Sequence, residues 1–147
     1  MVGGSYQNIN LDGTTEVSGL ELELAGRLSD EMTYRLAATR QFKEELVDVP
    51  DLQVSADVSY QLEKANIGLG VTYVDGASYG LANTTDSYTV TRAYGSYELN
   101  ESITLFGRVE NLFDEDYLLS DDGFLPITGQ GRSFVIGATL KLSLIHI

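Results

Sequence analysis

The sequence predicts an all-β protein, an antiparallel up-and-down meander of about eight strands. Three observations support this prediction. Apolar and polar residues alternate with a period of two along most of the 147 residues. A content of 15 Gly and 9 Tyr with only 2 Pro favours strands and turns over helices. Polar segments separate the alternating runs, as turns separate neighbouring strands.

The first clear strand is expected over residues 20–28. Leu20, Leu22 and Leu24 fall on one face of this strand, and Glu21 falls on the other. A helix would scatter these leucines around its axis, whereas a strand places them on one surface. The same alternation predicts a partial strand at 5–10 and further strands at 32–42, 52–62, 66–74, 87–99, 102–112 and 132–142.

The connections between these strands alternate in length. Tight polar turns are expected at 29–31, 63–65 and 100–102, and longer links at 43–50, 75–86 and about 113–131. Short turns at one rim and long loops at the other are typical of outer-membrane β-barrels. A soluble β-sandwich or meander, the alternative, has no reason to alternate in this way. A strand of about 9–11 residues crosses the bilayer with only alternate residues apolar, so the absence of a long apolar run is no obstacle.

The two faces of the predicted sheet also favour a barrel wall. The polar face carries mid-strand charges of both signs, which suit a wet or plugged lumen: Glu21, Glu23, Arg27, Arg35, Asp57, Arg92, Glu98, Arg108, Glu110 and Lys141. Aromatic residues gather near the strand ends, where interfacial girdles lie: Tyr34, Phe42, Tyr60, Tyr73, Tyr88 and Tyr97. Strand propensity alone also enriches Tyr, so the girdle is supporting evidence only.

Composition removes several functional classes. The formal net charge of −13 argues against a nucleic-acid partner. The chain has no Cys and a single His, His146, so it lacks the components of thiolate metal sites and of Ser-His or Cys-His catalysis. We therefore expect no catalytic residues, no metal site and no cofactor. The acidic segment 114–122 lacks the ligand spacing of a calcium loop and is interpreted as a solvated loop, with bound Ca²⁺ left open.

The last third of the chain resembles the C-terminal end of TonB-dependent outer-membrane receptors. Two stretches, LFGRVENLFDEDY at 105–117 and GQGRSFVIGATLKL at 129–142, carry the resemblance. The residues that match the family motif are Asn111, Leu112, Phe113, Asp114, Tyr117, Gly131, Arg132 and Phe134. Weaker likenesses at 17–24, 49–60 and 87–99 extend the resemblance over essentially residues 5–142.

The resemblance implies a fragment of a 22-strand transmembrane barrel in the bacterial outer membrane, with a plug domain inside the complete barrel. Such receptors bind a scarce nutrient, namely siderophore-bound iron, haem, cobalamin or a glycan, and import it with energy delivered by TonB. The implied partners are the lipid bilayer, the plug and remaining strands of the same receptor, TonB through the missing part, and a small nutrient ligand. Which nutrient is carried does not follow from the sequence.

The ends of the sequence suggest a piece of a longer protein. No signal peptide is visible at the N-terminus, so we expect the N-terminal part of the receptor to be missing. Residues 1–142 are assigned to the C-terminal portion of the barrel. Residues 143–147 are interpreted as a non-native tail, because LSLIHI at 142–147 matches the translation of a sequencing adaptor. A divergent natural terminus is the alternative.

Candidate ligand contacts lie in the two longest predicted loops. They are the aromatic and amide residues Tyr79, Asn83, Tyr117 and Phe124. Such loop aromatics also pack on one another. The alternative function is a stand-alone eight-strand outer-membrane barrel with a structural or adhesive role, since eight strands can close around their own side chains.

Overall fold

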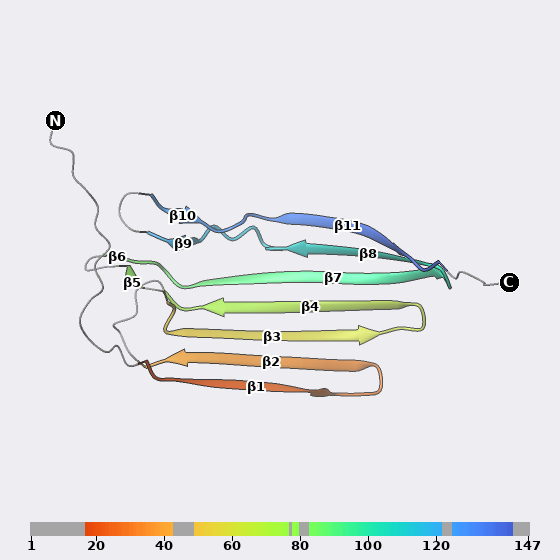
Figure 1. The fold of residues 1–147 in the computed structure, drawn as a ribbon, viewed down its shortest axis with the longest axis horizontal. Coiled ribbons are helices and arrows are strands. Elements are labelled where there is room, and N and C mark those ends of the chain that lie inside the picture. The colour runs from red at the N-terminus through yellow and green to blue at the C-terminus, as the bar shows by residue number, and fades with distance from the viewer. Residues whose placement is uncertain (1–16, 43–48, 77, 80–82, 122–124, 143–147) are drawn as a thin grey trace.

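A computed structural model describes residues 17–42, 49–76, 78–79, 83–121 and 125–142. These residues form a seven-stranded antiparallel sheet and two small hairpins (Figure 1). The sheet strands are β1 (Gly19–Arg27), β2 (Met32–Gln41), β3 (Leu52–Gln61), β4 (Ala65–Val74), β7 (Tyr88–Asn100), β8 (Ile103–Glu110) and β11 (Ser133–Leu140). The hairpins are β5 (Ser78–Tyr79) with β6 (Asn83–Thr84) and β9 (Leu118–Ser120) with β10 (Ile127–Thr128).

The predicted up-and-down meander is confirmed. Strands lie in the order β1-β2-β3-β4-β7-β8-β11, so each one pairs with the next sheet strand along the chain. The partial strand expected at 5–10 and the tail at 143–147 lie outside the described residues. The two hairpins were not predicted, because strands of two or three residues are too short to show a period.

The alternation in connection length is also confirmed. Two to four residues join β1 to β2, β3 to β4 and β7 to β8 at one end of the sheet. The segments 42–51, 75–87 and 111–132 link the strands at the other end, where both hairpins lie (Figure 1). The Ser29 hydroxyl closes the first short turn by accepting the N–H groups of Glu31 and Met32, at 3.2 and 3.1 Å.

The sheet has two different faces and almost no buried apolar core. Val74, 7% exposed, is the one buried hydrophobic residue in the described part of the chain. Large apolar side chains stand exposed on one face, up to 88% at Ile136. They include Leu20, Leu22, Leu24, Leu36, Val54, Val58, Ile67, Leu69, Val71, Leu105, Phe134 and Leu140. An apolar surface of this extent is unfavourable in water and requires an apolar cover.

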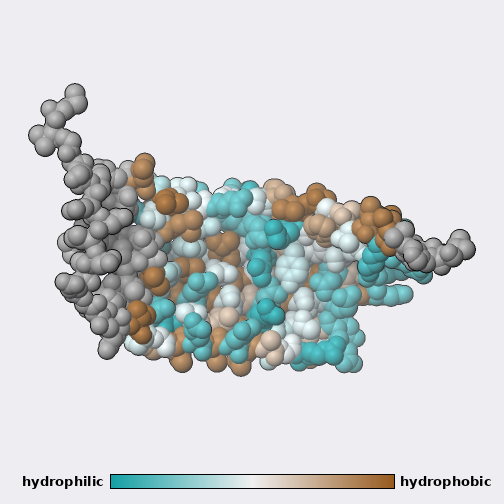
Figure 2. Space-filling model, viewed as in Figure 1, coloured by the Kyte–Doolittle hydropathy of each residue, from teal (hydrophilic) through white to brown (hydrophobic). Residues whose placement is uncertain are grey.

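The strand register assigns each residue to a face. Tyr34 pairs with Val58, Tyr73 with Val54 and Tyr97 with Leu105, so these three rings share the apolar face, as predicted. Tyr88 corrects the prediction, because it pairs with Val74 on the polar face. Figure 2 shows hydrophilic side chains over the middle of the face turned to the viewer, with hydrophobic ones toward its margins.

The edges of the sheet and the helix content complete the description of the fold. In the described residues β1 and β11 each pair with one neighbour only and lie at opposite edges of the sheet (Figure 1). The described sheet is therefore open. Within the described ranges there is no helix with the length and hydropathy needed to span a membrane.

Candidate ligand-facing wall

The polar face of the sheet carries ion pairs spread over five of its strands. Glu23 pairs with Arg35 at 3.9 Å, Arg92 with Asp57 at 2.9 Å, and Arg108 with Glu110 at 3.0 Å. The side chains are between 23% and 70% exposed, so solvent screens each pair, which contributes roughly 0–1 kcal/mol. Together they leave the wall nearly neutral and well supplied with hydrogen-bonding groups.

Asp57 is the centre of the best-connected cluster on this face. Its Oδ2 accepts a hydrogen bond from Arg92 Nη2 at 2.9 Å, and its Oδ1 accepts one from the Tyr94 hydroxyl at 2.7 Å. Asp57 lies on β3, whereas Arg92 and Tyr94 lie on β7. The strand between them, β4, must therefore be crossed by both β7 side chains.

Glycines on β4 make that crossing possible. A Cβ added at Gly68 would lie 2.2 Å from Tyr94 Cζ, and one added at Gly70 would lie 2.6 Å from Arg92 Nε. Both distances are far inside van der Waals contact. The glycines that face the polar side of β4 therefore provide the groove through which Tyr94 and Arg92 reach Asp57.

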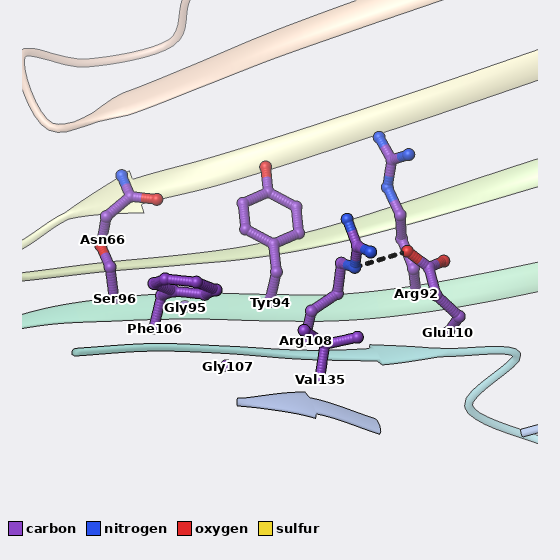
Figure 3. A pocket seen from close by; sticks show the side chains of 10 residues that line it. All are labelled: Asn66, Arg92, Tyr94, Gly95, Ser96, Phe106, Gly107, Arg108, Glu110 and Val135. Carbon is purple, nitrogen blue, oxygen red and sulfur yellow. Dashed lines mark ion pairs between the residues drawn. The ribbon is translucent and has the colours of Figure 1, made fainter. Parts of the chain in front are cut away.

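A concavity of about 410 Å³ lies beside this cluster, over β7, β8 and β11 (Figure 3). Tyr94, Phe106 and Val135 supply its apolar part. Phe106, 41% exposed, lies over Gly137, where an added Cβ would be 2.3 Å from the ring. Arg108 and Glu110 pair at its rim, while Arg92 and Tyr94 extend toward β3 (Figure 3). This hollow is therefore a concave surface on the polar face that combines apolar contact area with hydrogen-bonding groups.

At the long-loop end, the family-motif residues meet in what we call the loop clamp: Asn111, Asp114 and Arg132. Asn111 is 2% exposed and follows directly after β8. Its side-chain amide donates to the carbonyls of Glu115 and Gln130, at 2.8 and 3.0 Å. Its Oδ1 accepts the Glu115 N–H at 2.8 Å. One buried side chain thus holds both ends of the segment 111–132.

Asp114 and Arg132 complete the loop clamp. Asp114 accepts the Arg132 backbone N–H at 2.8 Å and the Arg132 Nη2 at 3.2 Å. Asn111 and Asp114 have φ angles of 50° and 59°, in the left-handed region that Asn and Asp tolerate better than other non-glycine residues. The Arg132 backbone N–H bond, helped by the guanidinium charge, lowers the pKa of the Asp114 carboxyl below its ordinary value.

Tyr117 joins the two longest loops. Its ring stacks on Tyr88, with ring centroids 4.2 Å apart and an interplanar angle of 26°. Gly129 lies against the same ring, because a Cβ there would be 2.0 Å from Tyr117 Cζ. The Gly129 N–H also donates to the Tyr117 carbonyl at 2.8 Å. Tyr117, a candidate ligand contact, therefore has its ring packed between Tyr88 and Gly129.

The remaining predicted site residues have varied positions. Leu112 donates its N–H to the Thr91 carbonyl at 2.7 Å, Phe113 is 76% exposed, and Phe134 lies on the apolar face. Gly131 lies beside Asp114. The backbones of Tyr79 and Asn83 pair in the small hairpin β5–β6, and Phe124 lies outside the described residues.

Sequence reasoning missed the cluster at Asp57 as a unit. The one available signal was the pair of glycines on the polar face of 66–74, which marks a close approach by other side chains. Among the described residues, no group of three or more His, Cys, Asp or Glu side chains is arranged to hold a metal ion.

Comparison with protein families gives a match over residues 1–112 to the family described as "TonB dependent receptor-like, beta-barrel". The chain is also similar to the vitamin B12 transporter BtuB of Photobacterium profundum. The two are 28% identical over 146 residues, which cover 94% of this chain and 23% of the transporter.

Solved structures share the fold. The ferric-catecholate import receptor Fiu of E. coli K12 aligns with a TM-score of 0.71 and 23% identity over 84% of this chain and 20% of the receptor. P. aeruginosa FpvA, solved with pyoverdine and iron, aligns with a TM-score of 0.74 and 17% identity over 84% of this chain and 19% of FpvA. The copper transporter OprC aligns with a TM-score of 0.75 and 17% identity over 86% of this chain and 24% of OprC. The chain thus spans a quarter or less of the length of these proteins.

Proposed function

Because the chain belongs to the TonB-dependent receptor β-barrel family, whose members lie in the outer membrane of Gram-negative bacteria, we propose that it forms part of the barrel wall of a nutrient receptor. The complete receptor takes up a scarce nutrient with energy from TonB. The proposed cargo is siderophore-bound iron, haem, cobalamin or a glycan. The proposed partners are a plug domain, the other barrel strands and TonB.

The observation that carries this proposal is the two-faced sheet. Exposed apolar side chains cover one face, and only Val74 of the described hydrophobic residues is buried. A lipid bilayer supplies the cover that such a face requires. We therefore assign the apolar face to lipid and the face with Asp57, Arg92 and Tyr94 to the lumen.

The long links supply the proposed outer surface. In outer-membrane barrels short turns lie on the periplasmic side and longer loops on the extracellular side. On this assignment the segments 75–87 and 111–132 face the medium, and the small hairpins lie at the receptor's mouth (Figure 1). Tyr79, Asn83, Tyr117 and Phe124 remain candidate ligand contacts in these loops.

A stand-alone eight-strand barrel is less well supported. Among the described residues β1 and β11 lie at opposite edges of an open sheet, as expected for a section of a larger wall. The relatives named above are also several times longer than this chain. Both observations favour a section of a larger wall.

An uptake experiment tests the proposed function. The gene that encodes this chain is deleted in its host, and uptake of labelled ferric siderophores, haem, cobalamin and oligosaccharides is measured with and without functional TonB. We expect the deletion to abolish uptake of one cargo only in TonB-positive cells, and the restored gene to recover it. Unchanged uptake of every cargo, or a loss that does not depend on TonB, would contradict the proposal.

A further inference from the structure

The pairing of β8 with β11 lacks the usual determinant of register. A short hairpin fixes register through its turn, as the two residues between β7 and β8 do. The strands β8 and β11 are joined instead by the long segment 111–132. A connection of this length is compatible with many different registers of the two strands. Another feature must select the observed pairing, in which Glu110 faces Ser133 and Ile103 faces Leu140.

The apolar pattern of β11 is not sufficient by itself to select the observed register. A slip of one residue would move Phe134 and Ile136 from the apolar to the polar face, and is excluded on that ground. A slip of two residues returns every side chain to its own face. It would leave the lipid-facing and lumen-facing sets intact, so alternation cannot discriminate against it.

The loop clamp does discriminate between these registers. Asn111 directly follows Glu110, the last paired residue of β8, and Arg132 directly precedes Ser133, the first paired residue of β11. The bonds from Asn111 to Gln130 and from Asp114 to Arg132 therefore join the two strands at the start of their ladder. A two-residue slip would displace Gln130 and Arg132 by about 7 Å, at roughly 3.3 Å per residue, and break these bonds.

We infer that the loop clamp sets the register of β11 against β8 and so determines how this strand is placed in the barrel wall. Its buried amide and paired charges are satisfied in one register only. The packing of the Phe106 ring over Gly137, in the middle of the ladder, is consistent with the same register. The inference concerns assembly of the wall and is independent of which nutrient the receptor carries.

Disulfide trapping tests the inference, because this chain has no cysteine of its own. In the receptor that contains the chain, with other cysteines replaced, L105C/A138C reports the observed register, since Leu105 and Ala138 are partners. L105C/L140C and L105C/I136C report slips of two residues in either direction. Oxidation is carried out in outer membranes, and disulfide-linked peptides are quantified by mass spectrometry.

With the unaltered clamp we expect the Leu105–Ala138 product to predominate strongly, with the two slipped products as minor, quantifiable species. With Asn111→Ala and Asp114→Ala together, or Asp114→Ala alone, slipped products should rise about fivefold for each net hydrogen bond lost. Asp57→Ala is the matched control, because it removes two hydrogen bonds from the β3–β7 cluster and should leave the slipped products at the level of the unaltered protein. It separates a register effect from general loosening.

Two results would overturn the inference. One is that both clamp variants leave the slipped products at the level of the unaltered protein, in which case Phe106 against Gly137 is sufficient. The other is that Asp57→Ala raises the slipped products as much as the clamp variants do. If the double variant does not assemble, Asp114→Ala alone decides the question on the same two criteria.

Discussion

The hydroxyl of Tyr94 donates a hydrogen bond of 2.7 Å to Asp57 across an intervening strand. Such a bond is possible only where the strand between has no side chains in the way, and Gly68 and Gly70 meet that condition on β4. Arg92 uses the same route to reach the other carboxylate oxygen. The strands β3 and β7, on either side of β4, are therefore tied together by one carboxylate, one guanidinium and one phenol.

The first prediction concerns the glycine groove. Gly70→Ala should destabilise the receptor by about 1–3 kcal/mol, because the new methyl group meets Arg92 Nε at 2.6 Å and Asp57 Oδ2 at 2.8 Å. Gly107→Ala is the control, since its Cβ would lie 3.8 Å from the nearest atom, the Val135 carbonyl oxygen. Urea unfolding in micelles measures both variants. Equal midpoints for the two would contradict the proposed crossing.

The second prediction is a coupling between Tyr94 and Asp57. Tyr94→Phe removes only the hydroxyl and should lower the free energy of unfolding by at most about 1 kcal/mol, because the site is partly exposed to solvent. In a double-mutant cycle with Asp57→Ala, the two changes should be non-additive, because each of them removes the Tyr94–Asp57 hydrogen bond. Unfolding free energies of the four proteins give the coupling. Strict additivity would show that the bond makes no net contribution.

The third prediction is a pH dependence at the loop clamp. Arg132 lowers the pKa of Asp114 in the folded state below the ordinary 3.8. A group with a depressed folded pKa contributes stability above its unfolded pKa, and this contribution is lost as the pH falls through the folded value. The stability advantage over Asp114→Asn should therefore be constant near neutral pH and shrink below 3.8. Unfolding midpoints of both proteins from neutral to acid pH measure it, and a difference that grows on acidification would contradict it.

The fourth prediction concerns the stacked pair Tyr88 and Tyr117. Gly129→Ala places a methyl group against the Tyr117 ring and should force that ring off Tyr88, with a loss of about 0.5–1.5 kcal/mol of stacking. Hydrogen exchange of 117–120 should then become faster. Gly131→Ala is the control, because its Cβ would meet only Asp114 Oδ1 at 3.5 Å. Exchange rates that respond equally to both changes would contradict the role of the stack.

The strands and their faces could be predicted because two environments act on them. Each residue of a wall meets either lipid or the lumen. Apolar and polar residues therefore alternate along each strand, as at Leu20, Leu22 and Leu24. The strand predicted at 102–112 extends two residues past the end of β8 at Glu110, where the φ of 50° at Asn111 turns the chain away. Tyr88 is predicted at the lipid interface because it is an aromatic residue near a strand end, although its register with Val74 turns it to the polar face.

The contacts between strands could not be predicted in the same way. Alternation defines the face of a residue but not its partner, so the approach of Tyr94 to Asp57 depends on registers that only the structure supplies. The motif at Asn111 and Asp114 was found by resemblance, and its hydrogen bonds to Gln130 and Arg132 became visible only in three dimensions. The short hairpins β5–β6 and β9–β10 carry too few residues to leave a pattern.

The central claim is that one face of this sheet meets lipid and the other meets the lumen. Single cysteines at Leu69 and Ile136 on the apolar face, and at Ser55 and Thr139 on the polar face, test it in outer membranes. A water-soluble maleimide should label Ser55→Cys and Thr139→Cys, once any plug is removed, and leave the other two unlabelled. Lipid-borne nitroxides should quench probes at Leu69→Cys and Ile136→Cys only. Equal labelling of both faces by the water-soluble reagent would contradict the claim.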